Sequence, residues 1–68
     1  MFADERKTKI IEIMKKRPSI ATSELTELFQ VSLETIRRDL ESLERQGVLK
    51  RVHGGAVALG GKQSGYVN

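Results

Sequence analysis

The sequence predicts one mainly α-helical domain that ends in a small β-hairpin. Its 68 residues allow only one small core, because a chain of this size buries only about 60% of its unfolded surface. Apolar residues recur at helical spacing in three segments before Gly47. After Gly47 the pattern changes to two short apolar stretches around the turn sequence "HGG", which is typical of a hairpin.

The first helix is expected from about Asp4, an acceptable N-cap, to about Lys16. The basic sequence "KKR" lies in its last turn, where the helix dipole favours cations. Pro18 disfavours helical angles at Arg17 and therefore ends the helix. The expected buried face consists of Ile10, Ile13 and Met14, with Ile11 at its edge.

The second helix is expected to begin at Thr22, its predicted N-cap, with Glu24 in the first turn. A helix of about eight residues needs tertiary packing to persist in water. The preceding "SIAT" is too short for an independent strand, but Ile20 is placed to join a small sheet. The expected apolar face of this helix consists of Leu25, Leu28 and Phe29.

The third helix is expected over residues 33–46. Ser32 is a strong N-cap, and Gly47 is the expected C′ residue. The predicted buried face is formed by Leu33, Ile36, Leu40 and Leu43.

A hairpin, or wing, is expected at about residues 48–59, with Gly54 and Gly55 supplying the positive φ angles of its turn. Two short helices joined by a tight turn and followed by a β-ribbon form the winged variant of the helix-turn-helix. The predicted domain spans residues 3–58, with the helix-turn-helix motif at about 20–39.

The last nine residues, "GGKQSGYVN" (60–68), contain three glycines and almost nothing to bury. This composition is interpreted as a flexible linker or a truncated tail.

The two adjacent arginines of the third helix are expected on different surfaces. At about 100° per residue, Arg38 lies opposite the buried face, whereas Arg37 lies on its shoulder. An outward arginine can donate a bidentate pair to guanine, a glutamate can accept from cytosine N4, and a threonine can contact a base edge or a thymine methyl. The sequence therefore predicts that Glu34, Thr35 and Arg38 contact bases in the major groove.

Other polar residues are expected to contact phosphates. Ser32 and the free N–H groups at the start of the third helix form an anion site, and Arg37 leans towards a passing phosphate strand. The wing carries positive or protonatable groups, and the second helix begins with two hydroxyls. The predicted phosphate-contacting set is Thr22, Ser23, Ser32, Arg37, Lys50, Arg51 and His53.

The distribution of charge fits a polyanionic partner. Residues 1–17 carry six basic and three acidic side chains, and residues 47–68 carry three basic and no acidic ones. Residues 18–46 carry three basic and six acidic side chains. Basic ends around a middle that is not basic suit two separate anchors on a nucleic acid.

Structural interpretations of the same residues stay open. Arg38 can pair with Glu34 or Glu41, and Arg37 with Glu41 or Glu44. Such surface pairs contribute about 0.2–0.5 kcal/mol.

Three further polar residues have plain structural roles as alternatives. Glu34 equally suits compensation of the helix dipole, and His53 suits a turn position. Asp39 is interpreted as structural, tethering a cation from the hairpin. A single histidine and no cysteine predict no metal site and no cofactor.

Taken together, these residues resemble a known family. They match the N-terminal DNA-binding domain of the DeoR family of bacterial transcriptional regulators over roughly residues 3–58. "TIRRDL" followed by "HGGA" about a dozen residues later is far more specific than a general helix-turn-helix pattern. The matching positions are Arg6-x3-Ile10-x3-Met14, Ser32-x-x-Thr35-Ile36-Arg37-Arg38-Asp39-Leu40, Leu43, Gly47 and "RVHGGA" (51–56).

The resemblance implies binding to double-stranded operator DNA. Members are mostly repressors of sugar and nucleoside catabolic operons and act as homo-oligomers. They usually carry a larger C-terminal domain that binds a phosphorylated sugar or a similar metabolite. That domain is absent from these 68 residues, which indicates a fragment or an isolated domain.

A winged-helix docking module for protein partners is the alternative function. It would need exposed apolar anchors on the third helix, whereas the outward positions are Glu34, Thr35, Arg38 and Glu41. An enzyme is not expected, because the chain has no phosphate-binding loop and no evident acid/base pair. The absence of a long apolar run and the charged N-terminus predict a cytoplasmic domain without a membrane partner.

Overall fold

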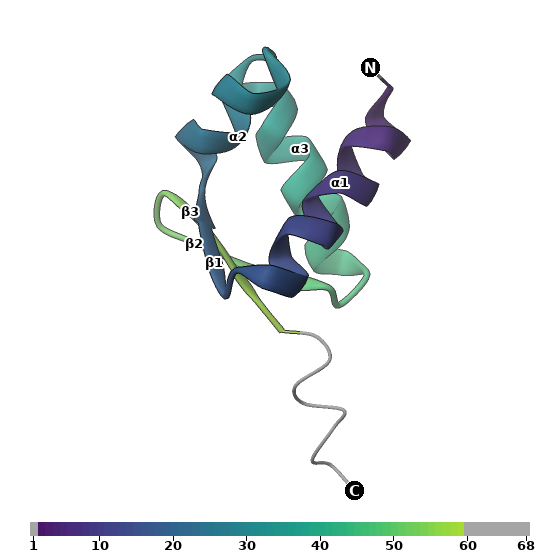
Figure 1. The fold of residues 1–68 in the computed structure, drawn as a ribbon, viewed down its shortest axis with the longest axis vertical. Helices are drawn as coiled ribbons and strands as arrows, with labels where there is room; N and C mark the ends of the chain where they lie inside the picture. Colours follow the sequence, from purple (N-terminus) through teal and green to yellow (C-terminus); the bar gives the residue numbers. More distant parts are fainter. Residues whose placement is uncertain (1, 60–68) are drawn as a thin grey trace, which may run out of the picture.

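Three helices and a three-stranded antiparallel sheet make up the computed structural model, which describes residues 2–59 (Figure 1). The mainly helical class with a hairpin after the third helix is confirmed. The linker expected at 60–68 lies outside the described residues. In chain order the elements are α1 (Ala3–Lys16), β1 (Ser19–Ala21), α2 (Thr22–Phe29), α3 (Leu33–Arg45), β2 (Leu49–Val52) and β3 (Gly55–Ala58).

The start of α1 differs from the prediction. Phe2, and not Asp4, is the N-cap residue. The carboxylate of Glu5 accepts a hydrogen bond from the backbone N–H of Phe2 at 3.2 Å. A glutamate at the third helical position that bonds back to the cap is half of a capping box, so it fixes the helix start without a capping side chain at position 4.

The same device moves the start of α2. Its N-cap is Ala21, and not Thr22 as predicted. Glu24 accepts from the backbone N–H of Ala21 at 3.0 Å, and this bond, followed by that from Arg17, lowers the pKa of Glu24. Thr22 is instead the first helical residue, and its hydroxyl donates to the carbonyl of Gly54 at 2.9 Å. The residue predicted as a cap therefore joins α2 to the turn of the wing.

The turn between α2 and α3 depends on Gln30, for which no role was predicted from the sequence. Gln30 adopts the left-handed conformation, with φ of 58°, and its side-chain amide donates to the carbonyl of Glu27 at 2.8 Å. Ser32 then caps α3 as predicted, accepting from the N–H of Thr35 at 3.2 Å. At the other end of α3, Gly47 has the positive φ expected of a C′ residue.

The sheet has β3 in its middle, paired with β1 on one side and with β2 on the other. The predicted contribution of Ile20 to a small sheet is confirmed, because it pairs with Ala56. Only one of the two turn glycines has the predicted positive φ: Gly54, at 80°. Gly55 is needed for another reason, since a Cβ on it would overlap the carbonyl oxygen of Ile20.

Two leucines predicted to be buried are exposed. Leu28 is 59% exposed because α1 and α2 each pack on α3 rather than closely on each other. Leu33 is 50% exposed because it is the first residue of α3 and lies beyond the end of the core, next to the wing. The core itself consists of Ile10, Met14, Ile20, Leu25, Ile36, Leu40, Leu43, Leu49 and Ala56.

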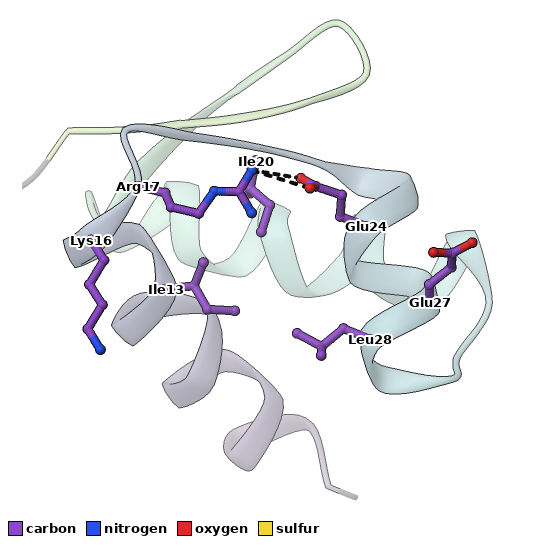
Figure 2. Close-up of a pocket in the computed structure, with 7 residues that line it drawn as sticks. All are labelled: Ile13, Lys16, Arg17, Ile20, Glu24, Glu27 and Leu28. Carbon is purple, nitrogen blue, oxygen red and sulfur yellow. Dashed lines mark hydrogen bonds and ion pairs between the residues drawn. The ribbon is translucent and has the colours of Figure 1, made fainter.

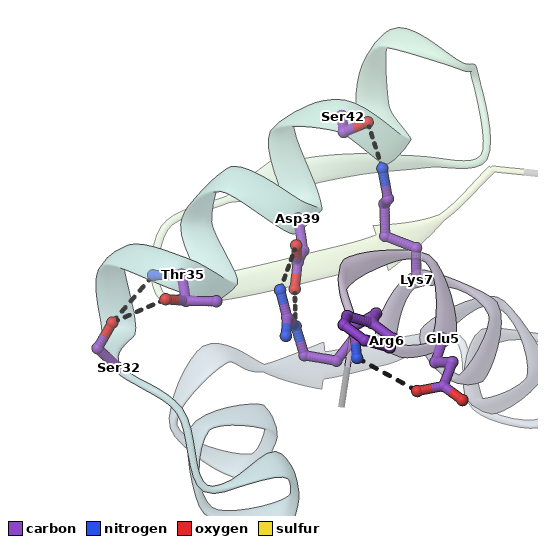
Figure 3. A network of polar contacts seen from close by, with 8 residues as sticks. Glu5, Arg6, Lys7, Ser32, Thr35, Asp39 and Ser42 are labelled. Atoms are coloured by element: carbon purple, nitrogen blue, oxygen red, sulfur yellow. Dashed lines mark hydrogen bonds and ion pairs between the residues drawn. The ribbon is translucent and has the colours of Figure 1, made fainter.

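A buried ion pair joins α1 to α3 (Figure 3). Arg6 donates from Nε and Nη2 to the two carboxylate oxygens of Asp39, and the side chains are only 10% and 5% exposed. Lys7 also reaches α3, donating to the hydroxyl of Ser42 at 3.3 Å. The structural role predicted for Asp39 is confirmed, but its cation comes from α1 and not from the hairpin.

We expect Asp39→Ala to lower the free energy of unfolding by about 3–5 kcal/mol, because it leaves the Arg6 guanidinium buried without its carboxylate. Replacing both partners with apolar residues, Arg6→Met with Asp39→Leu, should cost less than the single change. Urea unfolding measures both, and Asp4→Ala, which removes an exposed acid, is the control. A single-variant cost below about 1 kcal/mol would contradict a buried pair.

Gly55→Ala should destabilise the domain more than Gly54→Ala does. At Gly54 the cost is that of the left-handed conformation, about 1–2 kcal/mol, and nothing lies near the added Cβ. At Gly55 the added methyl collides with the β1 backbone and should separate β1 from β3. Thermal unfolding orders the two variants, and amide exchange at Ile20 reports the strand pairing. The reverse order would contradict the close approach.

Candidate nucleic-acid interface

The outward side of α3 carries Glu34, Thr35 and Arg38, which we call the recognition face. Glu34 and Arg38 are exposed, and Thr35 is half-buried. Arg38 Nε lies 3.6 Å from a carboxylate oxygen of Glu34, with side chains 77% and 67% exposed. This is the surface pair that the sequence left open. Such a pair contributes about 0.2–0.5 kcal/mol, which is less than the about 1–3 kcal/mol of a bidentate arginine–guanine contact.

The hydroxyls of Ser32 and Thr35 lie together at the start of α3 (Figure 3). Their oxygens are 3.0 Å apart, and Ser32 also accepts from the backbone of Thr35. Ser32 therefore orients Thr35 while it caps the helix. A predicted phosphate contact and a predicted base contact are neighbours that share one hydrogen-bond network.

A second surface lies on the shoulder of α3, where a cleft of about 670 Å³ separates the helix from the hairpin. We call it the wing cleft. Arg37 lines it and Arg38 does not, so the two adjacent arginines lie on different surfaces, as the helical spacing predicts. Four members of the predicted phosphate-contacting set meet here: Thr22, Arg37, Arg51 and His53.

The other three members of that set lie outside the wing cleft. Ser23, Ser32 and Lys50 are exposed, at the starts of α2 and α3 and on β2 respectively. Thr22 lies in the cleft, but its hydroxyl hydrogen is already donated to Gly54. The structure thus gathers part of the set around one concave surface and leaves the other three members outside it.

Glu44 is a residue of this surface whose role the sequence did not identify. Its carboxylate accepts from the backbone N–H of Arg51 at 3.0 Å and from Arg51 Nε at 2.9 Å. Hydrogen bonds from the backbone and then the side chain of Arg51 lower the pKa of Glu44. The pairing of Glu44 with Arg37, considered from the sequence, is replaced by a clamp between α3 and the wing. Only the reversal of the chain at Gly47 creates this contact.

Two apolar side chains of the wing cleft were also missed. Leu33 is 50% exposed and Val52 is 45% exposed, and both line the cleft. Apolar side chains beside guanidinium groups suit a strand of DNA, whose deoxyribose exposes C–H groups and whose phosphate is charged. The position of Leu33 at the end of its helix was the available indication that the core would not cover it.

Within residues 2–59, no three His, Cys, Asp or Glu side chains lie close enough to share a metal ion. In the same stretch, none of the helices has the length and apolar composition needed to cross a membrane.

The geometry defines a winged helix-turn-helix domain: α2 and α3 form the motif, the β2–β3 hairpin is the wing, and α3 presents a polar outward face. The family model for the DeoR-like helix-turn-helix domain matches residues 6–61. The chain therefore belongs to the DeoR-like helix-turn-helix family.

Relatives support the same assignment. The chain is 53% identical over 64 residues to the uncharacterized HTH-type transcriptional regulator YulB of Bacillus subtilis (strain 168), covering 94% of this chain and 25% of that protein. It is 46% identical to the transcriptional repressor AccR of Agrobacterium fabrum, over 81% of this chain and 21% of that protein. It is 48% identical to the glycerol-3-phosphate regulon repressor of Escherichia coli (strain K12), over 84% and 23% respectively.

The chain thus spans about a quarter of the length of the curated relatives it matches. No solved structure matches it significantly.

Acid should weaken the contribution of the Glu44 clamp. Because its folded pKa is lowered, the carboxylate stabilises the fold above its unfolded pKa, about 4.3, and loses this effect as pH falls through the folded value. Glu44→Gln lacks the carboxylate, so the stability difference between wild type and variant should shrink from neutral pH to about pH 3. Urea unfolding at several pH values measures it.

The matched control is Glu41→Gln, which removes an acid from the same helix but one paired with Arg45 instead of the wing. It should leave the amide resonance of Arg51 in place, whereas Glu44→Gln should shift it. A wild-type advantage over Glu44→Gln that stays constant with pH would disprove the clamp.

Proposed function

We propose that this domain directs a transcriptional repressor to its operator, with α3 in the major groove and the wing on the DNA backbone or in the minor groove. The observation that carries the proposal is the polar recognition face of α3 beside a cleft with two arginines. The family and the names of the relatives support it. In this proposal the DNA-binding unit spans residues 3–58.

Base contacts would come from the recognition face. Arg38 would leave Glu34 and donate two hydrogen bonds to the O6 and N7 of a guanine. Thr35, held by Ser32, would contact a base edge or a thymine methyl. Glu34, freed from Arg38, would accept from a cytosine N4. The ion pair in the free protein keeps both side chains on the side of the helix where the DNA would lie.

Phosphate contacts would come from the wing cleft and its surroundings. Arg37 and the outer edge of Arg51 would face one sugar-phosphate strand, with His53 and Thr22 beside it. Leu33 and Val52 would contact deoxyribose. Ser23, Ser32 and Lys50 would contact phosphates on either side of the cleft. These contacts are independent of sequence and depend on salt, because each displaces condensed counterions.

The regulated operon would belong to sugar or nucleoside catabolism. Relatives include a glycerol-3-phosphate regulon repressor and a lactose phosphotransferase system repressor of Streptococcus mutans. The effector, a phosphorylated sugar or similar metabolite, would bind a part of a longer protein outside these residues. That protein would act as a homo-oligomer in the cytoplasm.

Arg38→Ala and Lys50→Ala should separate base contacts from phosphate contacts. With duplexes selected from a random pool, Arg38→Ala should cost about 1–3 kcal/mol on the selected site and little on unselected DNA. Lys50→Ala should weaken binding to both similarly and reduce the slope of log affinity against log salt by about one. Fluorescence anisotropy at several salt concentrations measures both.

The two variants control for each other, because each removes one exposed cation. Equal losses for Arg38→Ala on selected and unselected DNA would remove Arg38 from the base contacts. An unchanged salt slope would remove Lys50 from the phosphate contacts. A pool that yields no enriched site would overturn the proposed function.

A further inference from the structure

A groove of about 640 Å³ lies between α1 and α2, on a part of the surface that the candidate DNA contacts do not use (Figure 2). It exists because both helices pack on α3 instead of closely on each other. The lining comes only from α1, α2 and the segment between them: Ile13, Lys16, Arg17, Ile20, Glu24, Glu27 and Leu28.

The middle of this α1–α2 groove is apolar. Ile13 of α1 and Leu28 of α2 point into the space between the helices (Figure 2). Leu28 is 59% exposed. Both residues also line a neighbouring hollow, so Leu28 stands as a ridge between two depressions. An apolar ridge flanked by hollows is shaped to fit a similar surface.

The two sides of the groove carry opposite charges. Lys16 and Arg17 lie on the α1 side, and Glu24 and Glu27 on the α2 side. Arg17 and Glu24 pair with each other at 3.1 Å across one end of the groove. Lys16 and Glu27 make no ion pair within residues 2–59. One cation and one anion, on opposite sides of an apolar centre, are therefore unpaired in the single chain.

We propose that the α1–α2 groove binds a second copy of this chain through a two-fold symmetric contact. A two-fold axis that runs between Ile13 and Leu28 exchanges the two sides of the groove. It places Lys16 of one copy against Glu27 of the other, twice, and packs Leu28 of each copy against Ile13 of the other. An isologous contact requires such a self-complementary surface.

The charges that line the groove favour a second copy of the chain over other binding partners. DNA is disfavoured, because two glutamates form one side of the groove. A partner of a single charge would meet repulsion on one side, whereas a two-fold copy matches both sides at once. The groove is small for a stable interface, so the isolated contact is weak. Adjacent half-sites on DNA would raise the effective concentration and make the contact cooperative.

The test uses the 68-residue chain without DNA, so its outcome is independent of the proposed function. Sedimentation equilibrium at concentrations up to about 1 mM should reveal a weak monomer–dimer equilibrium. Amide shifts that depend on concentration should be confined to the α1–α2 groove. Leu28→Ser should weaken the dimer about tenfold or more. Because Leu28 is 59% exposed, the variant should keep its fold, and an unchanged circular dichroism spectrum checks this.

A charge exchange identifies the two-fold contact. Lys16→Glu and Glu27→Lys should each weaken the dimer, because each places like charges opposite one another. Mixing the two variants should restore association, since both contacts in the mixed dimer are then attractive. Combining both changes in one chain should also restore it. Lys15→Glu, an equal charge change on α1 outside the groove, should have little effect.

Restored association in the mixture supports the proposal. A chain that stays monomeric over the whole concentration range overturns it. Self-association that is insensitive to the exchange, or shifts mapped to another surface, equally overturns it.

Discussion

A buried ion pair between Arg6 of α1 and Asp39 of α3 fixes how α3 is turned about its own axis. Apolar contacts alone have no direction, so Ile36, Leu40 and Leu43 could tolerate a rotated helix. A carboxylate that accepts two hydrogen bonds from one guanidinium does have a direction, and it is buried where displacement is costly. The recognition face therefore depends on a contact made on another side of the same helix.

Local spacing was sufficient to predict much of this arrangement. The apolar period of α3 placed Arg37 and Arg38 on different surfaces, and the cap at Ser32 and the C′ glycine at Gly47 gave the helix its ends. These features depend on residues within a turn or two of one another, which is the range over which helical geometry determines neighbours. The same reasoning misplaced Leu28 and Leu33, because periodicity gives a direction but not whether another element covers it.

The contacts that position the candidate interface are not local. Asp39 is paired with a residue 33 positions earlier, and Thr22 with one 32 positions later. Glu44 meets Arg51 only because the chain reverses between α3 and β2. No sequence pattern predicts which residues pair, because several lysines and arginines could each have paired with Asp39 or with Glu44. The fold class could thus be predicted from the sequence, while the contacts that support the candidate interface arise only in the folded structure.

Under the proposed function, α3 faces DNA although it carries more acidic than basic residues, and the positions of its acids account for this. Glu34 holds Arg38 on the recognition face, and Glu44 holds Arg51 at the edge of the wing cleft. Each carboxylate cancels charge at long range but restricts where its guanidinium can go, so less side-chain entropy is lost on binding. The more exposed pair, Arg38 and Glu34 at 3.6 Å, would open towards a base in the proposed complex. Glu44 also accepts a hydrogen bond from the backbone of the wing, so it holds α3 and the wing together. In the proposed complex, the acidic residues of this helix therefore orient the arginines, and the basic residues at either end of the chain supply the long-range attraction to DNA.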